Sequence, residues 1–282
     1  MEQFHDGYYV WLRSREHGTY LHADGDGQGV SLRLRRASMN AAWAVHRIHG
    51  DDQHVLLRSA AYGRYLAAAY AKAPRGCRGF RVRQRNYDFL DEEVIMWQAV
   101  RSRPGNDVLL RHSVGDRARH HYRYLRANGR YLPWRENVVS VHDFDDFDNI
   151  STMMHWVVEP IPSRQNVPRL PRPNMFHDIA GSLTAILPPR TVQFMGNSEG
   201  VYRHSVAFVF RGWSVFRLRN EVASRLHINR DVSDNLVMYV RAGRYGRYTP
   251  LVVDLPRSKQ TLVITFEPPA NVEARCPDVN AA

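Results

Sequence analysis

Three short motifs with alternating apolar and polar positions recur three times in the first 160 residues. The first motif is Val10–Ser14, which returns as Val55–Ser59 and as Val108–His112. A tyrosine-led motif follows each copy: Tyr20–Ala23, Tyr65–Ala68 and Tyr124–Ala127. A tryptophan-led motif closes each copy: Trp43–Val45, Trp97–Ala99 and Trp156–Val158. A period of two indicates a β-strand with one buried face, so the region is predicted to be three copies of one all-β unit.

Three such units predict a β-trefoil over residues 1–160. A propeller with three blades would be unusual, and a trefoil closes its sheet so that few strand edges are exposed. The predicted core combines the leucines of the first two motifs with the three tryptophans: Leu12, Leu57, Leu110, Leu21, Leu66, Leu125, Trp43, Trp97 and Trp156. We expect the tryptophans at threefold-related buried positions of one domain.

The connection between the first two motifs differs among the three copies. His17–Thr19 and Tyr62–Arg64 each place a glycine in a tight turn, where it can supply the positive φ that such a turn needs. The third copy has the longer connection Ser113–Tyr122. Two tight hairpins and one longer hairpin are therefore predicted.

Prolines interrupt the pattern between Pro160 and Pro189 and predict an extended linker over residues 161–189, since proline donates no N–H to a sheet. A second domain is predicted over residues 190–268, and residues 269–282 as a flexible tail. Five strands are expected in this domain: Thr191–Met195, Val206–Phe210, Leu236–Val240, Leu251–Leu255 and Leu262–Phe266.

One helix is expected in this domain, over residues 214–227. Ser214 can cap it, and its apolar stripe would be Val215, Leu218, Val222 and Leu226. The order strand, strand, helix and three strands is that of an α+β β-grasp, or ubiquitin-like, domain. The fold class is therefore mainly β, with a β-trefoil followed by a β-grasp domain.

The net charge of +11 favours an acidic partner. Almost all of the positive charge is arginine, because Lys72 and Lys259 are the only lysines. The arginines are scattered over both halves, so a nucleic-acid ligand is less favoured than an acidic protein surface such as an actin filament. Cys77 and Cys276 form no metal or disulfide motif, and neither a signal peptide nor a membrane span is visible. A cytoplasmic protein is expected, with the nucleus as an alternative.

Candidate chemical sites are few. Asp24–Gly29 and Asp143–Asp148 gather carboxylates, but the first lacks the glutamate of an EF-hand and both fit ordinary loops. The pair His120–His121 has no zinc-ligand spacing around it. We therefore expect no metal, no cofactor and no enzymatic activity.

The stretch Tyr124–Gly129, continued by Arg130–Val138, is similar to the signature of a plant family known as domain of unknown function 569. The segments Val10–Ser14 and Phe208–Gly212 also resemble that family. The resemblance implies a fascin-like trefoil and a non-enzymatic protein that binds or cross-links actin filaments. Arg130 and Leu132 depart from the Gly and Pro of the family pattern, so the turn between them can differ.

The same stretch supplies the candidate binding surface: Asn128, Gly129, Pro133, Trp134 and Arg135. Tryptophan beside arginine is favoured at binding hot spots. The more ordinary interpretation is a structural turn in which Trp134 fills the end of the barrel.

Two other function classes stay open, namely a carbohydrate- or nucleic-acid-binding trefoil and a protein-interaction scaffold. The Gln-x-Trp motif of ricin-type lectins is absent before Trp43, Trp97 and Trp156. The oligomeric state is left open by the sequence.

Overall fold

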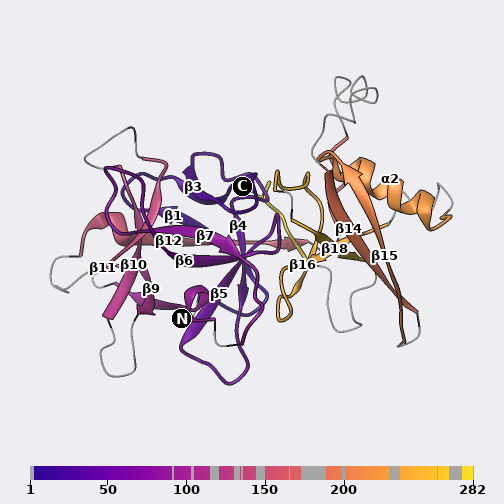
Figure 1. The fold of residues 1–282 in the computed structure, drawn as a ribbon. Coiled ribbons are helices and arrows are strands. Elements are labelled where there is room, and N and C mark those ends of the chain that lie inside the picture. The colour runs from indigo at the N-terminus through magenta and orange to yellow at the C-terminus, as the bar shows by residue number, and fades with distance from the viewer. Residues whose placement is uncertain are drawn as a thin grey trace.

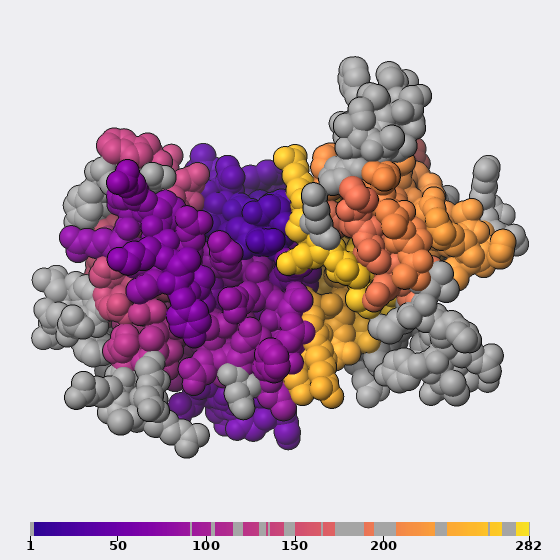
Figure 2. All heavy atoms as spheres, in the orientation of Figure 1, coloured from indigo at the N-terminus to yellow at the C-terminus, as the bar shows by residue number. Residues whose placement is uncertain are grey.

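A computed structural model of the chain describes residues 3–90, 92–102, 105–114, 121–129, 134, 136–143, 150–164, 166–172, 189–198, 201–228, 236–258, 260–266 and 275–281. It has a β-domain formed by the strands up to β12 and a smaller domain in which helix α2 lies against a sheet (Figure 1). The segments nearest the C-terminus, yellow in Figure 2, lie on the side of the second domain that faces the first.

The first domain is built around a closed barrel of six strands. They are β1 (Tyr9–Ser14), β4 (Ala42–His46), β5 (His54–Ser59), β8 (Trp97–Arg101), β9 (Val108–Val114) and β12 (His155–Ile161). Each pairs antiparallel with the next, and β12 pairs with β1, which closes the barrel. Closure leaves no free edge among these strands.

Three hairpins cover one end of the barrel, one from each repeat. They are β2 (Tyr20–Ala23) with β3 (Val30–Arg33), β6 (Tyr65–Lys72) with β7 (Phe80–Arg85), and β10 (His121–Ala127) with β11 (Val139–Asp143). The hairpins join one another through the β11–β7 pair and the bridges Gly29–Arg83 and Ser31–Val138. Short 3-10 helices, η1 (Glu93–Ile95) and η4 (Thr152–Met154), precede β8 and β12. The predicted β-trefoil is confirmed.

The barrel core repeats with the threefold pattern. All nine leucines and tryptophans expected from the motifs are fully buried in one cluster. Each tryptophan donates its indole N–H to the carbonyl of the leucine in the tyrosine-led motif: Trp43 to Leu21 at 3.0 Å, Trp97 to Leu66 at 2.9 Å and Trp156 to Leu125 at 3.0 Å. The core therefore satisfies its three buried indole donors in the same way in every repeat.

The second domain is a five-stranded mixed sheet with the order β15-β14-β18-β16-β17. The strands are β14 (Pro189–Ser198), β15 (Val201–Arg211), β16 (Tyr239–Arg241), β17 (Tyr248–Pro250) and β18 (Leu262–Thr265). The central strands β14 and β18 run parallel, which requires a crossover connection, and α2 (Val215–Arg225) lies in it. The β-grasp assignment is confirmed.

Helix α2 begins where the sequence indicates and ends earlier than expected. The Ser214 side chain accepts a hydrogen bond from the Arg217 N–H and caps the helix. Val215, Leu218 and Val222 are fully buried against the sheet. Leu226 lies beyond the last helical residue and is 37% exposed, so its assignment to the buried stripe was wrong.

Two of the expected strands lie elsewhere. The strand expected over Leu251–Leu255 lies earlier in the chain, as β17, which ends at Pro250. The strand expected over Leu236–Val240 is β16, which begins only at Tyr239. Leu251, Val252 and Leu255 are buried outside any strand. The Leu255 N–H donates to the Trp213 carbonyl just before helix α2, at 2.6 Å. An apolar run alone did not distinguish these two situations.

The C-terminal segment joins the linker in a small second sheet. β13 (Ser163–Arg164) pairs antiparallel with β19 (Cys276–Pro277), and the Tyr9 hydroxyl donates to the Arg275 carbonyl at 2.7 Å. Cys276 is fully buried, and burial raises the pKa of its thiol to about 11. A flexible tail was the wrong prediction for residues 275–281, whereas 267–274 lie outside the described residues.

Candidate functional site

The predicted surface in the third repeat divides into structural and exposed residues. Asn128 is buried, and its side-chain amide donates to Ser140 Oγ at 2.9 Å and to the Val138 carbonyl at 3.2 Å. Gly129 has φ +119°, and a Cβ there would lie 2.3 Å from Glu136 Cα. Both residues therefore shape the β10–β11 hairpin rather than offer a free binding group.

Trp134 lies on the outside of the same hairpin connection and is 73% exposed. It does not fill the end of the barrel, so that interpretation was wrong. Pro133 and Arg135 lie outside the described residues. Of the predicted surface residues that the structure describes, Trp134 is the exposed one and stays a candidate contact residue.

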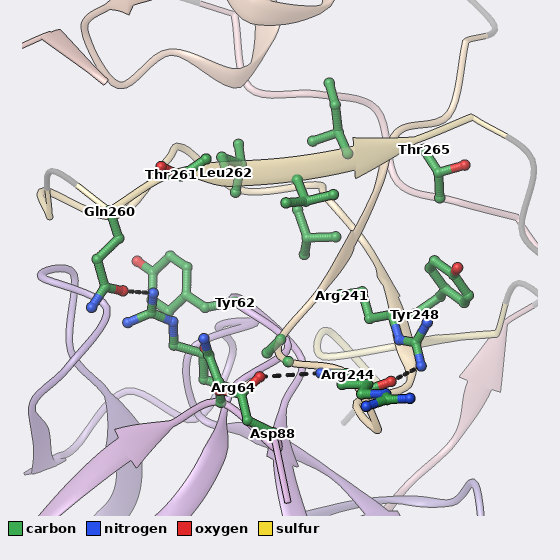
Figure 3. Close-up of a pocket in the computed structure, with 16 residues that line it drawn as sticks. Tyr62, Arg64, Asp88, Arg241, Arg244, Tyr248, Gln260, Thr261, Leu262 and Thr265 are labelled. Carbon is green, nitrogen blue, oxygen red and sulfur yellow. Dashed lines mark hydrogen bonds between the residues drawn. The ribbon is translucent and has the colours of Figure 1, made fainter. Parts of the chain in front are cut away.

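A different site is formed where the two domains meet. A pocket of about 520 Å³ is bordered by the second trefoil repeat on one side and by the β-grasp sheet on the other. Figure 3 shows Gln260, Thr261, Leu262 and Thr265 on the β18 side and Arg64, Asp88 and Arg244 across from them. Tyr62 and Tyr248 add an aromatic wall at each end.

The tight turn of the second repeat brings Arg64 into the pocket. Its guanidinium donates to the Gly27 carbonyl at 2.7 Å and also to Gln260 Oε1. Gln260 belongs to the second domain, so this side chain bridges the two domains. Burial lowers the pKa of Arg64, and the charge of Asp26 offsets part of that effect. No carboxylate forms an ion pair with Arg64 in the described part of the chain.

Arg241 and Arg244 supply the opposite cationic side. Arg241 donates to the Gly246 carbonyl at 2.9 Å and to the Arg244 carbonyl. Its guanidinium carbon lies 5.5 Å from the ring centre of Tyr248. Arg244 is exposed, and its backbone N–H donates to Asp88 Oδ1 at 3.2 Å. Three arginines thus surround the pocket with one carboxylate, that of Asp88.

A further arginine beside the pocket strengthens the positive potential. Arg190 is buried and donates to the carbonyls of Pro256 and Ser258. Its pKa is lowered first by burial and then by the positive charge of Arg64. Two desolvated cations that repel each other favour a nearby anion.

The pocket depends on close docking of the two domains. The buried Arg58 donates to the carbonyls of Tyr248 at 2.6 Å and Arg247 at 3.1 Å, and also to the Thr249 hydroxyl. The Tyr65 hydroxyl accepts from the Arg247 N–H at 3.0 Å and lies 2.8 Å from His46 Nδ1. These contacts position Tyr248 against the trefoil.

The sequence indicated the turn Tyr62–Arg64 but not its role. Its counterpart His17–Thr19 has the same length and the same glycine, so the repeat pattern alone treats the two as equivalent. The signal that was available is the change of the flanking residues from His and Thr to Tyr and Arg. Residues with large contact surfaces at one copy of a repeated turn are typical of an interface.

Of the other candidate sites, the aspartate loop of the first repeat forms ordinary structure. Asp24–Gly29 is the β2–β3 connection, in which Asp26 Oδ1 accepts from the N–H groups of Gln28 and Gly29 at 2.8 and 2.7 Å. Burial raises the pKa of Asp24, whose Oδ1 accepts from Ser31 Oγ at 2.6 Å. No group of three His, Cys, Asp or Glu side chains suited to a metal occurs among the described residues. Residues 144–148 and His120 lie outside them.

Two family models match the chain and decide its family. One is the β-trefoil domain of unknown function (DUF569), over residues 1–159, and the other is the DUF569-associated ubiquitin-like domain, over residues 188–266. The chain belongs to the DUF569 family. A search of the curated proteins finds no match.

Solved structures match a little over half of this DUF569 protein. A Caenorhabditis elegans protein of unknown function is 18% identical with a TM-score of 0.42, covering 56% of this chain and 96% of that one. The BEL β-trefoil is 14% identical with a TM-score of 0.41, covering 56% and 95%. An endo-β-galactosidase from Clostridium perfringens is 14% identical with a TM-score of 0.38, covering 55% and 33%. Likenesses at this level do not bear on the ligand.

Within the described ranges, the protein contains no helix with the length and apolar character that crossing a bilayer requires.

Proposed function

We propose that this DUF569 protein is a non-enzymatic binding protein whose ligand is anionic and binds in the pocket between the two domains. The observation that carries the proposal is the imbalance of charge around the pocket. Arg64, Arg241 and Arg244 line it together with the single carboxylate of Asp88. A bound anion would compensate this positive charge.

The environment of the Arg64 guanidinium favours a bound anion over a purely structural role. Its guanidinium is partly desolvated, which lowers its pKa, and it hydrogen-bonds only neutral oxygens in the described residues. A partly desolvated cation that no carboxylate contacts is unfavourable, and a charge-assisted bond to carboxylate, phosphate or sulfate would relieve that cost. The guanidinium also has N–H donors left for such a group.

Titration calorimetry on the full chain tests this function. The anions are pyrophosphate, citrate and a sulfated disaccharide, which carry the three anionic chemistries that arginine recognises. At least one is expected to bind with a strength that falls as salt rises. Arg64→Gln and Arg244→Gln should each weaken that binding about tenfold, as expected for a loss of roughly 1.5 kcal/mol or more from a charge-assisted hydrogen bond.

The control variant is Arg101→Gln, which removes the same charge from the trefoil. Arg101 donates to Asn106 Oδ1 at 2.7 Å and does not line the pocket. It should bind as the wild type does. Equal weakening of binding in all three variants would mean that the affinity depends on the overall charge of the protein and not on the pocket. If none of the anions and no acidic peptide binds, the proposal is overturned.

A second candidate function uses the third repeat. The exposed Trp134 favours a macromolecular partner at that surface, and the fascin-like resemblance points to actin filaments as one acidic candidate. Carbohydrate is the alternative ligand for an exposed tryptophan on a trefoil. Co-sedimentation with actin at low and high salt tests the first of these, and Trp134→Ala should abolish pelleting without changing the melting temperature. A glycan array tests the second.

A further inference from the structure

The sheet of the second domain splits at the pocket. β16 and β18 pair through Tyr239 with Thr265 and through Val240 with Ile264, and the ladder stops there. Arg241 continues to pair with Tyr248 of β17 but no longer with β18. On this side, the backbone of Thr261, Leu262 and Val263 has no strand partner among the described residues.

The trefoil holds the split open. The Tyr87 N–H donates to the Ala242 carbonyl and the Tyr245 N–H donates to the Tyr87 carbonyl, both at 2.9 Å. Gly243 has φ +89°, and a Cβ there would lie 2.4 Å from the Tyr87 carbonyl oxygen. The segment after β16 is therefore drawn toward the trefoil and away from β18.

The open side of β18 presents backbone groups of the kind that bind an extended peptide. Unpaired N–H and C=O groups of a strand can accept an added strand, which supplies alternating hydrogen bonds along its length. Three residues of such a strand span about 10 Å. Leu262 and Val263 line the pocket together with Thr261, so both the backbone and an apolar wall face the space.

The charges around the split select the side chains of such a peptide. Arg64 lies beyond the Gln260 end of β18 and Arg244 lies across the pocket, as Figure 3 shows. Carboxylates spaced along one face of an extended segment could reach both groups, since side chains on one face of a strand recur every second residue. A small anion would satisfy the arginines and leave the side of β18 that faces the split without a strand partner at residues 261–263.

We propose that the interdomain pocket binds an acidic peptide in an extended conformation, which pairs as a strand with residues 261–263 of β18 and places carboxylates at Arg64 and Arg244. This inference rests on the proposed function, because it names the class of anion that occupies the same pocket. It predicts a dependence on peptide backbone N–H groups that a small anion cannot have.

The probe is the peptide acetyl-Glu-Val-Glu-Val-Glu-amide, titrated calorimetrically into the full chain. Two further versions carry N-methyl groups, one on the glutamate amides and the other on the valine amides. In a strand that pairs along one edge, alternate N–H groups point toward β18. One methylated version should therefore bind at least tenfold more weakly than the parent, while the other retains most of the affinity.

Arg244→Gln should weaken the binding of the parent peptide about tenfold, whereas Arg101→Gln should leave it unchanged. Arg244 is a better test than Arg64. The Arg244 guanidinium is exposed and lies 5.6 Å from the ring centre of Tyr245. Its contact with Asp88 is made by the backbone N–H, which the substitution keeps. Unfolding curves of both variants establish that they are folded.

Four outcomes decide the inference. Loss of binding by one methylated peptide, with dependence on Arg244, supports it. Equal binding of both methylated peptides and the parent overturns it, as does binding of pyrophosphate, citrate or the sulfated disaccharide without binding of the peptide. In that last case the proposed function stands, whereas failure of every anion and of the peptide overturns both.

Discussion

The first and second trefoil repeats contain the same tight turn in two different surroundings. In repeat one the Gly18 N–H donates to the Ser14 carbonyl at 2.9 Å, and in repeat two the Gly63 N–H donates to Ser59 at 2.9 Å. Their φ angles are +66° and +69°. A Cβ on Gly18 would meet nothing within 4 Å, whereas one on Gly63 would lie 2.9 Å from Thr249 Oγ1 of the second domain.

The equivalent arginines before these turns differ in the same way. Arg13 forms an ion pair with Glu159 at 2.5 Å on the partly exposed outside of the barrel, whereas Arg58 is buried and holds three acceptors of the second domain. The inward positions of the repeat have kept one role and the outward positions have acquired different ones. The second domain docks on the second repeat because of those outward residues, and the candidate pocket is a consequence of that docking.

The largest expected effect concerns what the repeats share. Trp43→Ala, Trp97→Ala and Trp156→Ala should each lower the free energy of unfolding by about 3–5 kcal/mol, through the cavity and the lost indole hydrogen bond. Because the three side chains have the same burial and the same kind of acceptor, their costs should agree within about 1 kcal/mol. Denaturant unfolding measures this, and a single dominant tryptophan would break the equivalence of the repeats.

The next effect separates the two arginines. Arg58→Met should lower the free energy of unfolding by about 3 kcal/mol, since three acceptors of the second domain lose a charged donor. Arg13→Met should cost less than about 1 kcal/mol, as expected for a partly exposed ion pair. Urea unfolding of both variants tests this, and equal costs would mean that the docking of the domains adds no stability.

Acid should weaken the domain contact through His46. Burial and the charges of Arg247 and Arg58 lower the pKa of His46 to about 3. The unfolded state therefore binds more protons between about pH 6.5 and pH 3, and stability is lost as the pH falls through this range. At pH 5 the protonation of His46 in the unfolded state should lower the free energy of unfolding by up to about 2 kcal/mol relative to pH 7.

The measurement is the free energy of unfolding at pH 7 and pH 5 for the wild type and His46→Gln. The variant should show a smaller loss of stability between the two pH values. His5→Gln, on the exposed N-terminal segment, is the control. An unchanged loss in His46→Gln would assign the acid sensitivity to other buried histidines, of which His22 and His112 have pKa values lowered to about 4.

The smallest difference concerns the two glycines. Gly18→Ala and Gly63→Ala should each cost about 1–2 kcal/mol, because alanine is strained at positive φ. Gly63→Ala should cost roughly 1 kcal/mol more, since its Cβ meets Thr249. The melting temperatures of the pair measure the difference, and equal values would show that the second domain yields easily at this contact.

The repeats and the apolar stripe made much of the fold predictable. The nine core residues follow from period-two motifs, and helix α2 follows from its cap and from Val215, Leu218 and Val222. Leu226 was misassigned because helical spacing continues in the sequence for one residue after the helix has ended. The two-residue strand at Cys276 is too short for periodicity to reveal.

The candidate pocket was not predictable for a different reason. Arg58 and Arg64 donate mainly to backbone carbonyls of distant segments. Every residue has a carbonyl, so the sequence contains no signal for such a contact. The requirement for glycine at position 243 follows from the close approach of the Tyr87 backbone, which the local sequence does not reveal. The exposure of Trp134 likewise depends on how its hairpin folds, so the local sequence left both interpretations open.

Hydrogen–deuterium exchange on the full chain, with and without its tightest-binding anion or acidic peptide, tests the central claim most directly. The account predicts slower exchange at residues 62–64, 86–88 and 260–263, which border the interdomain pocket. The third-repeat hairpin around Trp134 should be unchanged. Protection centred on residues 128–143, with none at 260–263, would contradict the account and move the binding site to the third repeat.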